Sequence, residues 1–93
     1  MLGLFLLIKA MLAFSPEAWE DYVFWQTTND AVLQRINLLL KDILRSPRDG
    51  LGKPEALKWG LSGCWSRRID REHRLVYRMD GSAIHILSCR YQY

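Results

Sequence analysis

Residues 74–91, RLVYRMDGSAIHILSCRY, contain the pattern on which the fold depends. An Asp-Gly pair at 80–81 separates two runs rich in apolar side chains, which is a strong signal of a β-hairpin with a two-residue turn. We therefore predict strands over 74–79 and 83–91. In the first strand, Leu75, Tyr77 and Met79 share one face, which should be buried. A further strand is predicted over 64–69.

Two helices are predicted upstream of these strands. Ser15-Pro16-Glu17 has the residues of a helix start, with serine at the N-cap, proline at the first position and an acid in the first turn. This helix should end near 28, and Ser46-Pro47 should end a second helix that begins near 30. The apolar faces are predicted to be Trp19, Tyr22, Val23 and Gln26 in the first helix and Leu33, Ile36, Leu40, Ile43 and Leu44 in the second.

The order of elements predicts an α+β domain. A short strand at 12–14 precedes the helices, and a loop at 48–60, with one helical turn at 55–59 as an alternative, precedes the later strands. The order is therefore β-α-α-β-β-β, with two N-terminal helices packed on one face of a small antiparallel sheet. The other face of the sheet would remain available for polar groups.

The first ten residues, MLGLFLLIKA, are interpreted as an apolar extension or a misassigned start before a single domain over 11–93. A membrane span needs about 20 apolar residues, and the run also lacks the basic region of a signal peptide. A membrane anchor is the less favoured alternative, and Met11 offers a second start.

The cysteines and histidines indicate a reduced compartment and no metal site. Two cysteines, Cys64 and Cys89, in a chain without a convincing export signal are typical of a cytoplasmic protein. They and the two histidines, His73 and His85, lack the paired spacing of a zinc site. No metal or other cofactor is expected.

Positive charge is concentrated in the second half of the chain. Residues 1–50 carry five Lys or Arg against six Asp or Glu, whereas residues 51–93 carry eight against four. Six arginines fall within 24 residues: Arg67, Arg68, Arg71, Arg74, Arg78 and Arg90. Arginine binds phosphate through two parallel N–H groups, so the cluster predicts an anionic partner, of which nucleic acid is the commonest. Surface ion pairs with neighbouring acids are the alternative.

Aromatic rings and one carboxylate accompany these cations. The aromatic residues are Trp59, Trp65, Tyr77, Tyr91 and Tyr93. Such rings can stack on unpaired RNA bases, although core packing is favoured for Trp65 and Tyr77. Glu55 lies between Lys53 and Lys58, where a carboxylate keeps its charge and can accept a proton. An ordinary solvated glutamate is the alternative.

Several motifs in this order resemble the YoeB (Txe/YoeB) toxins of the RelE-like superfamily. They are GKPEALK at 52–58, LSGCWSRRI at 61–69, EHRLVY at 72–77 and CRYQY at 89–93. Residues 15–25 and 36–47 are similar to the two helices of that family, so the resemblance covers residues 11–93. It implies a fold in which two N-terminal helices back a small sheet, in agreement with the order of elements above.

The resemblance implies the toxin of a type II toxin–antitoxin system, which enters the ribosomal A site and cuts mRNA. A ribose 2′-hydroxyl would attack the adjacent phosphate without a metal ion, while a base removes its proton, cations stabilise the phosphorane charge and an acid protonates the leaving 5′ oxygen. By position, Glu55 corresponds to the base, Arg74 to the phosphate-stabilising arginine, Arg68 and Lys58 to supporting cations, and Tyr93 to the terminal tyrosine. Lys53, Arg67 and Arg90 complete the predicted phosphate-binding set.

Gln92 departs from the family pattern, which ends in Tyr-His-Tyr. That histidine is the family's general acid, and a neutral amide cannot donate a proton usefully near pH 7. We predict an active but slower nuclease, with Tyr93, Lys58 or a ribosomal nucleotide as alternative proton sources. Two other hypotheses remain: a weakened or inactive toxin that binds its antitoxin and autoregulates, and a small basic nucleic-acid-binding module without chemistry.

The resemblance implies two partners, a YefM-like antitoxin and the 70S ribosome carrying mRNA. The antitoxin should be acidic and partly disordered until it wraps the basic face. Residues 91–93 are expected to shift on binding, because chain ends are held least firmly. No membrane partner is expected, and the sequence leaves open whether the chain forms a homodimer.

Overall fold

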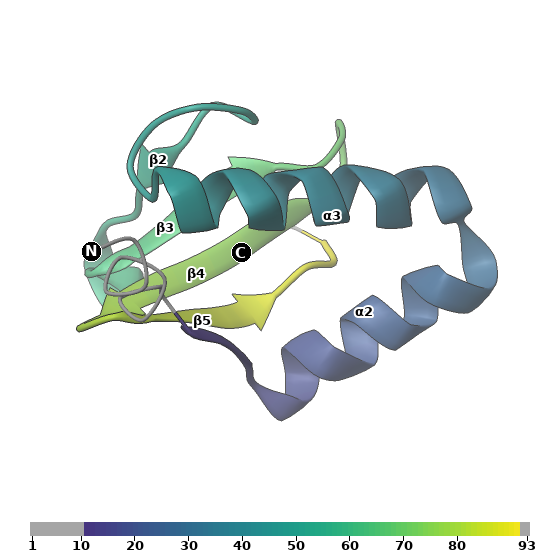
Figure 1. The fold of residues 1–93 in the computed structure, drawn as a ribbon, viewed down its shortest axis with the longest axis horizontal. Helices are drawn as coiled ribbons and strands as arrows, with labels where there is room; N and C mark the ends of the chain where they lie inside the picture. Colours follow the sequence, from purple (N-terminus) through teal and green to yellow (C-terminus); the bar gives the residue numbers. More distant parts are fainter. Residues whose placement is uncertain (1–10, 92–93) are drawn as a thin grey trace, which may run out of the picture.

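The computed structural model describes residues 11–91, in which two helices cover one face of a five-stranded sheet (Figure 1). The elements in chain order are β1 (Met11–Phe14), α2 (Pro16–Thr28), α3 (Asp30–Arg45), β2 (Glu55–Ala56), the 3-10 helix η1 (Trp59–Leu61), β3 (Cys64–Arg68), β4 (Arg74–Asp80) and β5 (Ala83–Ser88). The predicted α+β architecture, with two N-terminal helices before the main strands, is confirmed. Neither helix in this part of the chain is long and apolar enough to cross a bilayer.

Two details of the predicted elements are wrong. The loop over 48–60 contains the short strand β2, because Glu55 and Ala56 pair with Ser66 and Trp65 of β3, and its helical turn comes later, at η1. The last strand ends at Ser88 rather than at 91, because the next backbone N–H, that of Cys89, donates to the Asp21 carboxylate of α2 at 3.0 Å.

The sheet is mixed rather than purely antiparallel. Its strand order is β1-β5-β4-β3-β2, in which β1 runs parallel to β5 and the other neighbours are antiparallel. Met11 pairs with Ala83 and Phe14 with Ile86, so the first and last strands lie side by side. A parallel pair needs a long crossover, and here it contains both helices and the other three strands. The antiparallel prediction failed at this pair because the direction of an edge strand depends on tertiary packing.

The first helix begins where its cap predicts, but its buried face differs from the prediction. Ser15 Oγ accepts the Ala18 N–H at 3.0 Å, as an N-cap should. Ala18 and Trp25 are the buried residues of α2, whereas Trp19, predicted to face the core, is 52% exposed. Trp25 packs in the main core, and its indole N–H donates to the carbonyl of Cys89, directly after β5, at 2.9 Å, so this side of the helix lies against that segment.

The second helix follows its predicted apolar stripe more closely. Ile36, Leu40 and Ile43 are buried in the main core. Leu44, predicted to share the stripe, is 38% exposed. A charged residue, Asp42, is buried on this helix instead, and its partners lie on β3, in the loop after α3 and at the end of α3 itself.

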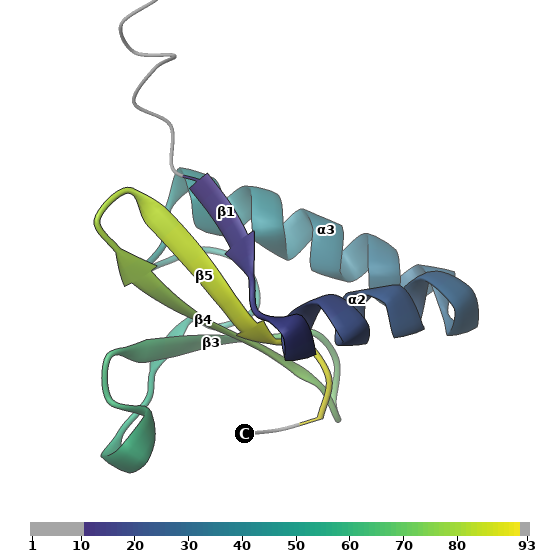
Figure 2. The same cartoon turned by 90° about the horizontal axis from the view of Figure 1, so that it is seen from below.

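The sheet has one face covered by the helices and one open face (Figure 2). Side chains along each strand alternate between these two faces. Leu75 and Tyr77 are buried on the helix face, in the main core with α2 and α3. A smaller apolar cluster on the open face consists of Leu57, Cys64 and Val76. The alternation predicted for β4 is thus confirmed, and it places Arg74 on the open face. In Figure 2, the green loop that carries η1 projects away from the helices.

Candidate active site

A carboxylate and a guanidinium approach each other on the open face of the sheet. Glu55 of β2 pairs with Ser66 of β3, and Ser66 pairs with Val76 of β4. Paired residues project from the same face, and Glu55 Oε1 lies 3.8 Å from Arg74 Nη1. The Glu55 side chain is 59% exposed whereas that of Arg74 is 16% exposed. The pair therefore joins a solvent-accessible proton acceptor to a largely covered cation.

A second arginine of the open face lies opposite Arg74 in the sheet. Arg68 is directly opposite Arg74 in the ladder between β3 and β4, and its side chain is exposed. Like charges directly opposite each other repel, so an anion that binds between them is favoured. A phosphate group suits this place because each arginine can offer it two parallel N–H groups. The structure thus brings Glu55, Arg68 and Arg74 onto one surface.

An exposed indole lies on the loop that follows Glu55. A shallow hollow is lined by residues 55–61, and Lys58 is the N-cap of η1 within it. Trp59 is 91% exposed and has a φ of 63°, a left-handed conformation that is strained for a bulky residue. Such strain is maintained by the surrounding structure and is frequent at binding sites. Lys53 and Lys58, which flank Glu55 in the chain, are both exposed.

The hydroxyl of Ser66 lies beneath this surface. Ser66 is fully buried between Glu55 and Val76 in the ladder. Among the buried side-chain polar atoms of residues 11–91, its Oγ is the one without a hydrogen bond. A buried hydroxyl without a partner costs free energy. The sequence contains no signal for this position, because a serine in a strand is unremarkable by composition.

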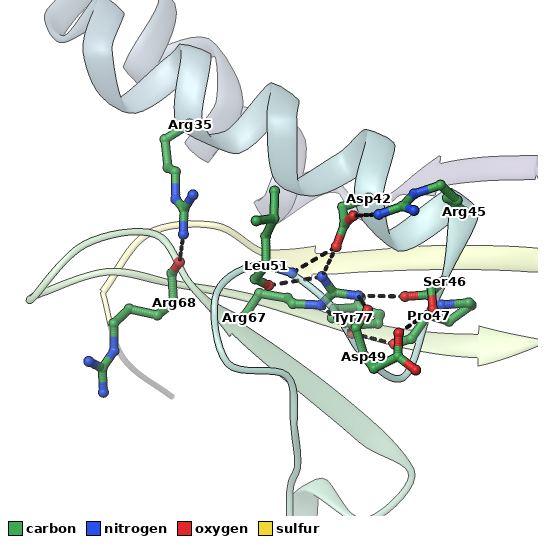
Figure 3. Close-up of polar contacts among 10 residues, drawn as sticks. All are labelled: Arg35, Asp42, Arg45, Ser46, Pro47, Asp49, Leu51, Arg67, Arg68 and Tyr77. Carbon is green, nitrogen blue, oxygen red and sulfur yellow. Dashed lines mark hydrogen bonds and ion pairs between the residues drawn. The ribbon is translucent and has the colours of Figure 1, made fainter.

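Arg67 is a structural residue, and the prediction that it binds RNA phosphate is wrong. Its side chain is fully buried on the helix face (Figure 3). Its Nη1 donates to Asp42 Oδ2 at 2.6 Å and to the Leu51 carbonyl at 2.9 Å. Its Nη2 donates to the Ser46 carbonyl at 2.7 Å and to the Asp49 carbonyl at 3.1 Å. Its Nε donates to the Tyr77 hydroxyl at 3.0 Å. These contacts use all five N–H groups of an arginine, so none is left for a ligand.

Asp42, which sequence analysis missed, is the anionic partner of Arg67. Its carboxylate accepts from the Arg45 side chain, from the Leu51 backbone N–H at 2.8 Å and from Arg67. These hydrogen bonds, of which that from Arg45 contributes most, hold the pKa of Asp42 well below its usual range. In the sequence, the sign that Asp42 could be buried was its position next to Ile43, a member of the apolar stripe of α3.

The Arg67–Asp42 pair holds the loop that leads to Glu55. Both side chains bind the backbone of residues 46–51, and the Arg68 N–H donates to the Gly52 carbonyl at 2.7 Å. Gly52 has a φ of 78°, and a Cβ there would lie 3.0 Å from the Arg68 carbonyl, so the loop requires glycine at this position. The position of Glu55 therefore depends on the buried network beneath it.

Arg90 packs against two aromatic rings. Its guanidinium carbon lies 3.6 Å from the centre of the Phe24 ring of α2 and 4.6 Å from that of Tyr91. These cation–π contacts hold the Arg90 side chain against α2. The predicted site residues Gln92 and Tyr93 lie outside the described residues.

Both cysteines are buried free thiols, Cys64 on the open face and Cys89 after β5. Burial, with a smaller contribution from the Asp21 carboxylate, raises the pKa of the Cys89 thiol to about 12. Within residues 11–91, the structure has no group of three or more side chains that could hold a metal ion.

Together with a family match that covers most of the chain, the helix pair and the mixed sheet identify the class of protein as the toxin of a bacterial type II toxin–antitoxin system. Residues 14–93 match the family described as YoeB-like toxin of bacterial type II toxin-antitoxin system. This match spans most of the chain, so the protein belongs to the YoeB toxin family.

Known proteins of this family are similar over nearly their whole length. Toxin YoeB of Escherichia coli K12 is 51% identical over 82 residues, which cover 88% of this chain and 98% of that protein. The YoeB dimer from Staphylococcus aureus is 48% identical with a TM-score of 0.85, covering 91% of this chain and 99% of that one. The heterotetrameric YoeB–YefM complex from the same organism gives 48% identity, a TM-score of 0.83 and the same coverage. The fold alone extends to the RelBE2 toxin–antitoxin complex of Mycobacterium tuberculosis, with 23% identity and a TM-score of 0.67.

Proposed function

We propose that this toxin is a ribosome-dependent endoribonuclease that cleaves mRNA in the A site and thereby inhibits translation. The observation that carries the proposal is the Glu55–Arg74 pair on the open face, with Arg68 directly opposite Arg74. A proton acceptor beside two phosphate-binding groups is what cleavage of a phosphodiester by its neighbouring 2′-hydroxyl requires. Membership of the YoeB family supports the same reaction.

In the proposed reaction, Glu55 removes the proton of a ribose 2′-hydroxyl, whose oxygen attacks the adjacent phosphorus. The bond from phosphorus to the 5′ oxygen of the next nucleotide breaks, which leaves a 2′,3′-cyclic phosphate, and that oxygen takes up a proton from an acid. Arg74 and Arg68 stabilise the negative charge that develops on the phosphate oxygens. Lys53 and Lys58 would neutralise neighbouring phosphates.

The acid in this reaction is proposed to be a group other than residue 92. Gln92 can donate a hydrogen bond to a phosphate oxygen, but its amide cannot give up a proton near pH 7. Tyr93, Lys58 or a ribosomal nucleotide would then protonate the leaving oxygen. General acid catalysis typically contributes about 10²–10⁴-fold, so cleavage should be slow but measurable, and Gln92→His should accelerate it.

Gln92 also favours a second candidate function. A toxin without its general acid could persist as an antitoxin-binding partner that regulates its own operon and no longer cuts RNA. A third candidate is a basic module that binds nucleic acid through its arginines without chemistry. Cleavage that depends on Glu55 separates the first candidate from both of these.

The test is mRNA cleavage on programmed 70S ribosomes, mapped by primer extension. The wild-type protein should make one A-site cut that requires ribosomes. Glu55→Gln, which keeps the shape of the side chain and removes its basicity, should abolish the cut. Glu20→Gln, an exposed carboxylate on α2, is the matched control and should cut normally. A folded wild-type protein that binds antitoxin or ribosomes and makes no cut would refute the nuclease function.

We propose a YefM-like antitoxin as partner, and a homodimer as the form free of antitoxin. The Staphylococcus aureus relatives support both, one as a dimer and one as a heterotetramer with YefM. An acidic antitoxin segment would complement the exposed cations of the open face. Light scattering of the toxin alone and with its antitoxin would give both stoichiometries. The ribosome as target implies action in the cytoplasm.

A further inference from the structure

The backbone of Tyr91 is bound by two residues at the start of β4. The Arg74 N–H donates to the Tyr91 carbonyl at 2.9 Å, and the Tyr91 N–H donates to His73 Nδ1 at 2.7 Å. Tyr91 has a φ of 63°, a conformation that is unfavourable for an aromatic residue and that these bonds must impose. The chain is thus fixed beside Arg74 one residue before Gln92.

His73 can accept the Tyr91 N–H only as a neutral imidazole. A protonated ring carries hydrogen on both nitrogens, so Nδ1 would then face a second donor. The neutral ring must carry its hydrogen on Nε2, and Glu72 Oε1 lies 3.7 Å from that atom. The hydrogen bond to Tyr91 therefore depends on the charge of His73.

The surroundings hold this ring in place. It packs edge-on against Trp25 of α2, with 4.8 Å between ring centres, and the His73 backbone N–H donates to Asp70 Oδ1 at 2.7 Å. The charged groups around it are Glu72 and Asp70 of the preceding turn and Arg90, which lines the same hollow. From α2 the ring meets the uncharged side chain of Trp25.

We propose that His73 is a positioning residue whose neutral ring anchors the Tyr91 backbone beside Arg74, and that protonation of the ring breaks this anchor and lowers cleavage. The inference rests on the proposed nuclease function and adds a pH-dependent element to it. His73 acts through the backbone of Tyr91 rather than on RNA.

Hydrogen exchange of the Tyr91 amide tests the anchor without reference to catalysis. His73→Asn places an acceptor where Nδ1 stands and does not titrate, whereas His73→Leu removes the acceptor and keeps an apolar side chain. Corrected for intrinsic exchange, Tyr91 protection in the wild type should fall about tenfold, the scale of one hydrogen bond, between pH 7.5 and pH 5.5. It should persist at both pH values in His73→Asn and be weak at both in His73→Leu.

The Cys89 amide provides the internal control. Its bond to the Asp21 carboxylate, at 3.0 Å, does not involve His73, so it should stay protected in every variant. If both amides lost protection in His73→Leu, that variant would be unfolding the whole segment. The test would then rest on His73→Asn, in which Tyr91 protection should be the same at both pH values. Unchanged Tyr91 protection in His73→Leu would overturn the inference.

Ribosomal cleavage gives the second readout. The acid-side loss of activity in the wild type should be absent in His73→Asn, and His73→Leu should be weak across the range. If His73 served only to stabilise the fold, His73→Asn would not both restore cleavage and remove the loss of activity at acid pH. If His73→Leu cleaves as the wild type does, the anchor is irrelevant and the nuclease function stands. If the wild type never cleaves, the nuclease function fails, and the exchange experiment still decides the anchor.

Discussion

Arg67 and Arg68 are neighbours in β3 with the same chemistry and opposite environments. Arg67 projects to the helix face, where it is fully buried and donates to five fixed acceptors. Arg68 projects to the open face, where it is exposed and opposite Arg74. A single step along the strand therefore separates an arginine that holds the fold together from one that is available to a ligand. Strand alternation, rather than residue type, decides between the two roles.

The same division runs through the whole sheet. The helix face satisfies its charge internally, through Asp42 and the carbonyls of the loop after α3. The open face presents its charge to solvent through Arg68 and the Glu55–Arg74 pair. Substitutions on the helix face should therefore change stability, and substitutions on the open face should change cleavage.

The largest effect is expected from Arg74→Met on the open face. Loss of a group aimed at charge that develops in the transition state typically costs about 10²–10³-fold in rate, while the Arg74 backbone bond to Tyr91 remains. Arg78→Met, an exposed arginine on the same face of β4, is the matched control and should cleave normally. Single-turnover cleavage on ribosomes measures both. Equal losses in the two variants would mean that overall positive charge, and not the Glu55–Arg74 pair, drives the reaction.

The second effect, on the helix face, comes from Arg67→Met. Breaking a buried ion pair costs about 3–5 kcal/mol, and four carbonyl or hydroxyl acceptors lose their donor as well. Arg68→Met should change stability by less than about 0.5 kcal/mol, as is usual at exposed positions. Urea unfolding compares the two variants. An Arg67→Met protein with wild-type stability would show that the arginine on the helix face is not needed for the stability of the fold.

A smaller effect is expected from Trp59→Ala. Stacking of one base on an aromatic ring is worth about 1–3 kcal/mol, so kcat/KM on programmed ribosomes should fall roughly tenfold, with Trp59→Phe close to the wild type. Trp19, also exposed but next to the helix-face core, is the control. Trp19→Ala should leave kcat/KM unchanged. A normal kcat/KM for Trp59→Ala would show that the indole does not contribute to RNA binding.

The smallest effect concerns the buried thiol of Cys89 and alkaline pH. Burial raises the pKa of this thiol to about 12, whereas an unfolded cysteine titrates near 8.5. Since the folded pKa is the higher one, the stabilisation is complete below the unfolded pKa and is lost as the pH rises toward the folded value. From pH 7 to 9, the free energy of unfolding should fall by roughly 1 kcal/mol more in the wild type than in Cys89→Ala. Parallel pH profiles of the two proteins would contradict this.

The elements that depend on local signals could be predicted from the sequence. Ser15 capped the first helix as expected, the second helix spans Asp30–Arg45, and the turn after Asp80 joins two antiparallel strands. The direction of β1, the existence of β2 and the buried side of α2 could not be predicted. Each depends on partners that are distant in the chain, such as the Cys89 carbonyl that binds Trp25.

The candidate site was predictable in part, for a similar reason. The resemblance to a toxin family singled out Glu55, Arg68 and Arg74, and the fold brings these three together. Arg67 was misplaced because a run of arginines does not show which face each one takes. Asp42 was missed because a charge on an amphipathic helix normally faces solvent, and its burial becomes intelligible only with Arg67 opposite it.

The pairing of β1 with β5 joins the two ends of the domain. Met11 pairs with Ala83, so the first strand finds its place only when the last strand is present. Contacts between residues so distant in the chain form slowly. During folding, β1 must therefore wait for residues 83–86 before it can pair, and the Arg74 N–H must wait for the Tyr91 carbonyl. A chain that lacks residues 83–91 therefore has neither a partner for its first strand nor the backbone bond beside Arg74, so the sheet and the candidate site are completed by the same late segment.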